Sequence, residues 1–153
     1  MTTRRDFLVV AGGLAGGISL AASAGNARAT PAAMQEAVRK VVGEAPIRRG
    51  RVKLDVPPLI DNGNVVPLSV SVESPMTPSD HVKAIHVLTE RNPLPNVASF
   101  HLGPRAGRAR VATRVRLADT GTVLAIAQLS DGSYWSDSAH VVVTLSACLE
   151  DLV

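Results

Sequence analysis

The spacing of apolar side chains changes once along the chain, near residue 44. Between residues 30 and 43 they recur every three to four positions, whereas later apolar residues mostly alternate with polar ones. The first period is that of an amphipathic helix, and the second is that of a half-buried strand. Thr30 and Pro31 are typical first residues of a helix, and Gly43 is a typical end. The pattern therefore predicts one short helix followed by an all-β chain.

Seven segments after the helix have the composition and alternation of strands. Clusters of Pro, Gly, Asn and Asp separate them, as in "VPPLIDNGN", "RNPLPN" and "ADTG". The predicted strands cover residues 50–56, 65–73, 82–90, 97–102, 108–118, 121–130 and 139–145. Short strands separated by turns predict a β-sandwich with the N-terminal helix as its only helix.

The segment "RARVATRVRL" has the clearest alternation in the sequence. One face is mostly apolar and is predicted to join the core; it holds Ala109, Val111, Thr113, Val115 and Leu117. The other face forms what we call the arginine ridge, which consists of Arg108, Arg110, Arg114 and Arg116. Same-face residues lie about 7 Å apart, so the ridge would be a continuous positive strip. It is either a solvated strand face or a docking surface for an acidic partner.

The N-terminus has the features of a twin-arginine export signal. Arg4 and Arg5 precede an apolar stretch over residues 7–24, and the small-residue site "ARA" ends at Ala29. Four glycines interrupt the apolar stretch, which favours a cleaved signal over a retained membrane anchor. We expect a signal peptide over residues 1–29, and a periplasmic mature chain of residues 30–153 that forms a single domain without a membrane segment.

Removal of that leader changes the charge of the chain. The full sequence has a formal net charge of +3, but residues 30–153 contain 13 Lys and Arg against 12 Asp and Glu. A nearly neutral domain with only Phe100, Tyr134 and Trp135 as aromatic residues lacks the basic footprint of a nucleic-acid-binding protein. Tyr134 and Trp135 are expected either at a corner of the core or at an interface.

The chain has one cysteine, Cys148, five residues before its end. A single thiol in an oxidising compartment cannot form a disulfide within the chain, so it is idle, paired with another molecule, or used chemically. The four histidines do not have the spacing of a zinc motif; they are His81, His86, His101 and His140. A Cys-His catalytic pair would require a contact that the sequence does not indicate. We expect no metal, no cofactor and no enzymatic activity.

Three motifs and the near-terminal Cys148 make the mature chain resemble the SoxY family of sulfur-carrier proteins. The motifs are "DNGNVVP" at residues 61–67, "NPLP" at residues 92–95 and "TRVRLA" at residues 113–118. The resemblance implies an immunoglobulin-like β-sandwich that forms a periplasmic heterodimer with a SoxZ-like protein. It further implies that Cys148 holds thiosulfate-derived sulfur covalently, while enzymes of the SoxAX, SoxB and SoxCD type, with heme, manganese and molybdenum, process the sulfur compound.

The segment around Cys148 departs from the family pattern. The family has Gly-Gly-Cys-Gly-Gly, whereas this chain has "SACLE" at residues 146–150. An arm from Leu145 to Cys148 would reach roughly 10 Å, and Ala147 and Leu149 would give it less freedom than glycines. Glu150 and Asp151 are expected to raise the pKa of the thiol above about 8.5. The alternative function is a SoxY-like non-carrier module that still pairs with a SoxZ-like partner and serves another periplasmic redox system.

Overall fold

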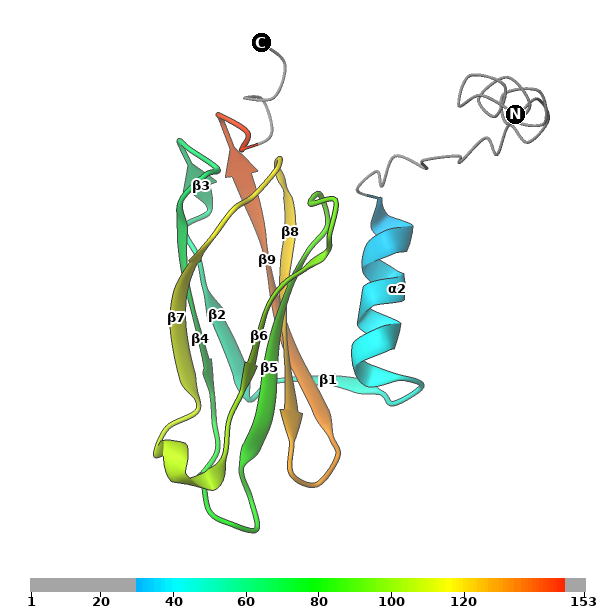
Figure 1. Ribbon diagram of the computed structural model, residues 1–153, viewed down its shortest axis with the longest axis vertical. Helices are drawn as coiled ribbons and strands as arrows, with labels where there is room; N and C mark the ends of the chain where they lie inside the picture. The colour runs from blue at the N-terminus through cyan, green and yellow to red at the C-terminus, as the bar shows by residue number, and fades with distance from the viewer. Residues whose placement is uncertain (1–29, 148–153) are drawn as a thin grey trace, which may run out of the picture.

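The computed structural model describes residues 30–147, so the predicted leader and Cys148 lie outside the described residues. Nine strands form two sheets that pack face to face, and one α-helix lies on the outer face of the larger sheet (Figure 1). This architecture confirms the predicted all-β, immunoglobulin-like sandwich with a short N-terminal helix. No helix within residues 30–147 has both the length and the apolar character needed to cross a membrane.

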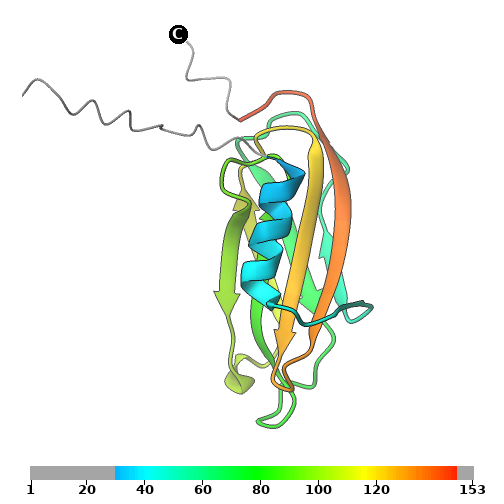
Figure 2. The same cartoon turned by 90° about the vertical axis from the view of Figure 1, so that its right-hand side faces the viewer.

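The helix α2 (Pro31–Val42) has the predicted caps. The Thr30 hydroxyl accepts a hydrogen bond from the backbone N–H of Ala33 at 3.1 Å, and Gly43 ends the helix with a φ of 63°. A positive φ of this kind favours glycine. The apolar face of the helix lies against Leu88 and Ile126 of the larger sheet (Figure 2). This contact forms a second, smaller core on the outer face of that sheet.

The larger sheet has six strands and the smaller sheet has three. The larger sheet has the order β1-β9-β8-β5-β6, with β3 also paired to β9; the smaller sheet has the order β2-β4-β7. The larger sheet contains β1 (Ile47–Arg49), β3 (Leu59–Ile60), β5 (Val82–Thr89), β6 (Asn96–His101), β8 (Gly121–Leu129) and β9 (Tyr134–Val143). The smaller sheet contains β2 (Val52–Asp55), β4 (Val66–Val72) and β7 (Arg110–Val115), and the 3₁₀ helix η1 (Pro104–Ala106) precedes β7.

The main core lies between the two sheets and consists almost entirely of aliphatic side chains. Strand β4 shows the expected alternation, because Val66, Leu68, Val70 and Val72 are buried and the residues between them are not. Strand β5 is buried on both faces, since one face meets the main core and the other lies near the helix. Apolar burial of this extent is the principal stabilising contribution to such a fold.

All seven predicted strands are present, but three details of the prediction are wrong. Strand β9 begins at Tyr134 rather than residue 139, and β7 ends at Val115 rather than residue 118. The short strands β1 and β3 were not predicted. Both pair in parallel with β9, near its start and its end respectively. Strands of two or three residues have too few positions to show a period, and only the distant partner defines them.

Candidate functional site

Four segments meet at the end of the sandwich where the described chain ends. They are residues 61–65 after β3, 90–95 between β5 and β6, 116–120 between β7 and β8, and 144–147 after β9 (Figure 1). We call this region the tail end. Antiparallel pairing places Gly121 of β8 opposite Val141 of β9, and Val123 of β8 opposite Thr89 of β5, so these strand ends lie at one end of the sheet. The segments are therefore neighbours because of strand pairing and not because of their sequence separation.

Gly63 is the centre of the tail end. Its N–H donates a hydrogen bond to the carbonyl oxygen of Leu145 at 2.8 Å, and its own carbonyl accepts from the N–H of Leu117 at 2.9 Å. A Cβ at this position would lie 2.4 Å from the Leu117 oxygen and 3.1 Å from the Ala147 nitrogen. Glycine is required here because two backbone segments approach it closely.

Leu117 connects Gly63 to the last described residue. The Leu117 carbonyl accepts a hydrogen bond from the N–H of Ala147 at 3.3 Å. Asn92 holds both flanking residues: its Nδ2 donates to the Arg116 carbonyl at 2.8 Å, and its Oδ1 accepts from the Ala118 N–H at 2.9 Å. We call this set of hydrogen bonds through Gly63, Leu117 and Asn92 the backbone clamp.

Thr144 adds a second attachment just after β9. Its N–H donates to the carbonyl of Ile60 at 2.9 Å, and its hydroxyl donates to the carbonyl of Asp61 at 3.0 Å. These bonds continue the parallel pairing between β3 and β9 beyond the last paired residues. The chain is thus held to the sandwich at Thr144, Leu145 and Ala147 in succession.

Residues 145–147, the described part of the expected arm, are therefore attached to the sandwich. Both Leu145 and Ala147 form backbone hydrogen bonds with the clamp, which an extended arm in solvent would lack. The sequence did not indicate this because the partners, Gly63 and Leu117, belong to other turns. Cys148 follows directly after the clamped residues and lies outside the described part of the chain.

The arginine ridge has the predicted alternation. Arg108, Arg110, Arg114 and Arg116 are exposed, while Ala109, Val115 and Leu117 are buried. The single ion pair within residues 30–147 joins Glu36 to Lys40 on the helix, so these arginines are not paired with acidic side chains there. Strand β7 is also an edge strand of the smaller sheet, which leaves the ridge accessible.

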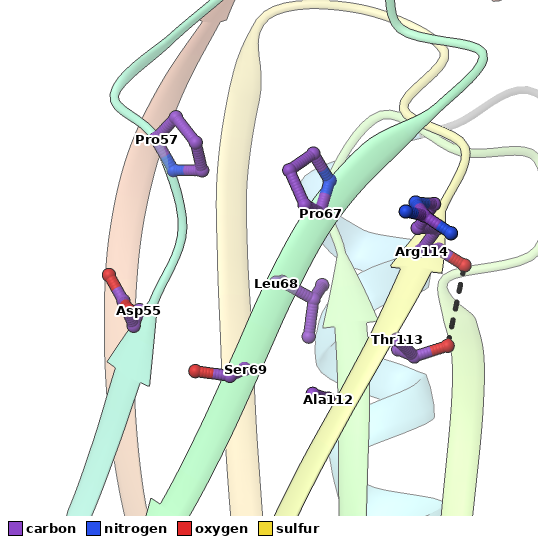
Figure 3. Close-up of a pocket in the computed structure, with 8 residues that line it drawn as sticks. All are labelled: Asp55, Pro57, Pro67, Leu68, Ser69, Ala112, Thr113 and Arg114. Atoms are coloured by element: carbon purple, nitrogen blue, oxygen red, sulfur yellow. Dashed lines mark hydrogen bonds between the residues drawn. The ribbon is translucent and has the colours of Figure 1, made fainter.

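A shallow hollow of about 760 Å³ lies on the outer face of the smaller sheet (Figure 3). It forms where β2 ends at Asp55 and the chain crosses to the other sheet through Pro57. Pro67 lies one residue inside β4, beyond the last β2–β4 pair, so its missing N–H leaves no gap in that ladder. The lining of the hollow contains one carboxylate, on Asp55, and one guanidinium, on Arg114, and no nucleophile paired with a base. The hollow has a structural explanation and does not suggest a catalytic centre.

Tyr134 and Trp135 lie on opposite faces of β9. Tyr134 packs near the helix, and its hydroxyl accepts a hydrogen bond from Gln128 at 3.0 Å. Trp135 packs against the main core, and the guanidinium carbons of Arg48 and Arg51 lie 5.7 and 5.3 Å from the centroid of its ring. Packing against the core matches the first of the two expectations for this aromatic pair.

Two of the four histidines are neighbours on the larger sheet. The rings of His86 and His101 are edge-to-face with centroids 6.2 Å apart, and His86 Nδ1 lies 2.8 Å from the hydroxyl of Ser99. Burial, and secondarily the neighbouring His101, hold the pKa of His86 below its usual range. Residues 30–147 contain no group of three or more His, Cys, Asp or Glu side chains placed to hold a metal.

Comparison with known proteins identifies the family. Residues 38–148 match the family described as sulfur oxidation protein SoxY. The chain belongs to the SoxY family. No curated protein sequence gives a significant match.

Solved structures agree with this membership in SoxY. The fold is similar to that of the sulfur carrier protein SoxY from Chlorobium limicola f thiosulfatophilum, with a TM-score of 0.61 and 27% identity over 74% of this chain and 98% of that one. A superoxide reductase (neelaredoxin) from Ignicoccus hospitalis has a TM-score of 0.54 at 20% identity, covering 79% of this chain and 98% of that one. A putative superoxide reductase from Thermotoga maritima has a TM-score of 0.53 at 20% identity, covering 64% and 87%. These reductases share the fold alone.

The three SoxY-like motifs in the sequence supply the backbone clamp. Gly63 comes from "DNGNVVP", Asn92 from "NPLP", and Leu117 from "TRVRLA". These motifs carry the sequence resemblance, but the sequence alone does not indicate a role for any of the three residues. A glycine after Asp-Asn and an asparagine before proline are the available signals, and both also fit ordinary turns.

Proposed function

We propose that this SoxY-family chain is a periplasmic sulfur carrier, exported by the twin-arginine route, that holds thiosulfate-derived sulfur covalently on Cys148. A thiolate is a good nucleophile, and sulfur–sulfur bonds exchange under mild conditions. Joining the thiolate to thiosulfate through a new sulfur–sulfur bond releases two electrons, so the step requires an electron-accepting partner. An enzyme of the SoxAX type would fill that role, and SoxB-like and SoxCD-like enzymes would process the bound group.

The observation that best supports this proposal is the backbone clamp. The hydrogen bonds from Gly63 and Leu117 hold the chain to the sandwich up to Ala147, one residue before the thiol. A carrier must present its cysteine at a defined place, and ordering the preceding residues in advance lowers the entropic cost of docking. The chain itself would perform no turnover. A SoxZ-like protein is the proposed heterodimer partner.

The alternative is a SoxY-like module that pairs with a SoxZ-like partner but carries no sulfur. The residues beside the thiol favour it, because Ala147 and Leu149 give the chain less freedom than the glycines of the family pattern. The residues that follow, Leu149 to Asp151, add bulk and negative charge that would disfavour an anionic substrate.

The intact mass of the protein tests the proposal. The chain is isolated from the periplasm of thiosulfate-fed cells and measured with and without a reductant, beside a Cys148→Ser control. A reductant-sensitive mass increase that is absent from the control is the expected result. A bare thiol, or only a disulfide-linked dimer, would contradict the carrier function and favour the non-carrier module.

A further inference from the structure

The exposed large apolar side chains of the described chain are confined to one region. There are five in residues 30–147, and we call them the apolar collar: Leu59, Val65, Leu94, Val142 and Leu145. Isolated exposed apolar residues are ordinary on protein surfaces, but a group at one place indicates an interaction site.

Strand pairing and the backbone clamp place the whole collar at the tail end. Leu59 lies opposite Val142 in the β3–β9 pairing, and Leu145 accepts the hydrogen bond from Gly63. Val65 follows Gly63 by two residues and immediately precedes β4. Leu94 follows Asn92 by two residues, in the segment that the clamp ties to β7. Leu94 and Val65 are also strongly exposed, at 77% and 57%.

The chain between the clamp and Cys148 is short. Adjacent Cα atoms are about 3.8 Å apart, and Ala147 is bonded through its N–H to Leu117. In the sequence, Cys148 is therefore only one peptide unit away from a residue that is bonded to the sandwich. A protein that acts on this thiol must come into contact with the tail end, and so with at least part of the collar.

Within residues 30–147, the charged side chains at the tail end do not favour a partner of either sign. Asp61 and Asp119 are exposed there together with Arg91 and Arg116, so the two signs are balanced. Because the electrostatic potential at the tail end has no dominant sign, attraction to a partner has to come mainly from apolar contact. A small apolar patch also suits a carrier, because large apolar interfaces belong to permanent complexes.

We propose that the apolar collar is the docking surface for the enzymes that load and process sulfur on Cys148. The collar would contact an apolar rim on the enzyme, around the entrance of the active site that receives the thiol. This inference rests on the proposed carrier function. We assign this surface to the processing enzyme; a second copy of this chain and the SoxZ-like partner are the alternatives that the experiment distinguishes.

The test compares Leu94→Ser/Val65→Ser with the wild type, using each full chain together with any partner that copurifies. Thiosulfate and a periplasmic extract from cells lacking this chain are added, and the adduct on Cys148 is followed by intact mass at several carrier concentrations. Reaction with iodoacetamide measures the intrinsic reactivity of the thiol. Pro78→Ser/Ala106→Ser, at exposed positions on the opposite end of the sandwich, is the matched control.

The double collar variant should require about tenfold more carrier for half-maximal loading, because the two replaced side chains lose their apolar burial against the partner. Its reaction with iodoacetamide and the loading of the control should match those of the wild type. Equal loading of wild type and collar variant would overturn the collar proposal alone. Unchanged loading together with a smaller assembly by light scattering would also overturn it, and would assign the collar to a copy or to the SoxZ-like partner. Absence of any adduct on the wild type would overturn the carrier function, and the collar proposal with it.

Discussion

Gly63 and Leu117 approach so closely that a Cβ on Gly63 would lie 2.4 Å from the Leu117 carbonyl oxygen. The same two residues are joined by the hydrogen bond from the Leu117 N–H to the Gly63 carbonyl at 2.9 Å. Because Leu117 in turn accepts from Ala147, a displacement at Gly63 is transmitted directly to the last described residue. The position of the chain before Cys148 thus depends on one side chain being absent.

Replacing Gly63 with Ala should destabilise the sandwich. The added Cβ would push the Leu117 backbone away, and such overpacking costs about 1–3 kcal/mol of unfolding free energy. Urea unfolding measures that loss, and hydrogen exchange at the Ala147 amide should become faster. Gly103→Ala is the matched control, since a Cβ there meets nothing within 4 Å. Equal stability of the two variants would contradict this account of Gly63.

Replacing Asn92 with Ala should weaken the backbone clamp by removing the two hydrogen bonds that hold the residues on either side of Leu117. The change leaves the Arg116 carbonyl and the Ala118 N–H without their side-chain partner, at a cost of about 0.5–1.5 kcal/mol for each hydrogen bond, because neither is fully buried. The unfolding free energy and the exchange rate of the Ala118 amide report the effect. Asn64→Ala serves as control, because within residues 30–147 that side chain forms no hydrogen bond. Unchanged Ala118 exchange in Asn92→Ala would argue against the bridge.

The stacking of Arg48 and Arg51 on Trp135 can be tested by fluorescence, because Trp135 is the single tryptophan of the chain. The arginine side chains cover the ring, so replacing both with Ala should increase acrylamide quenching. Each stacking contact should also contribute about 0.5–1 kcal/mol to stability. Arg49→Ala, at the last residue of β1, should leave quenching unchanged. If all three changes act alike, the effect is one of net charge and not of stacking.

His86 should make folding sensitive to mild acid. Burial, and then His101, lower its pKa in the folded protein, so the unfolded chain binds the proton more tightly. The contribution to stability is therefore present above the unfolded value of about 6.5 and is lost as the pH falls through the lower folded value. Unfolding measured from about pH 8 to pH 5 should show a smaller loss in His86→Gln than in the wild type.

A proton titration by NMR separates the two causes of the His86 shift. In His101→Gln the titration midpoint of His86 should rise only part of the way toward its usual range, because burial is the larger cause. Complete return to the usual range in that variant would show that the neighbouring ring, and not burial, controls the pKa.

The parts of the fold that could be read from the sequence are those with a local signal. Thr30, Pro31 and Gly43 mark the ends of the helix by their own backbone preferences, and the alternation in β4 and β7 identifies which face is buried. The sequence predicts a late start for strand β9 because "YWSDS" contains polar residues typical of a turn, although pairing with β8 extends the strand back to Tyr134. Pairing across the sheet overrides local propensity in such cases.

The sequence by itself determined the helix, the seven longer strands, the arginine ridge and the resemblance to SoxY, because each depends on residue types at short spacing. Only the tertiary structure decided that Gly63, Asn92 and Leu117 form one clamp and that the chain is held as far as Ala147. It also gathered Leu59, Val65, Leu94, Val142 and Leu145 at a single end. The physical reason is that β-sheet hydrogen bonds join residues far apart in the chain, and local sequence carries little information about which distant carbonyl a given amide will meet.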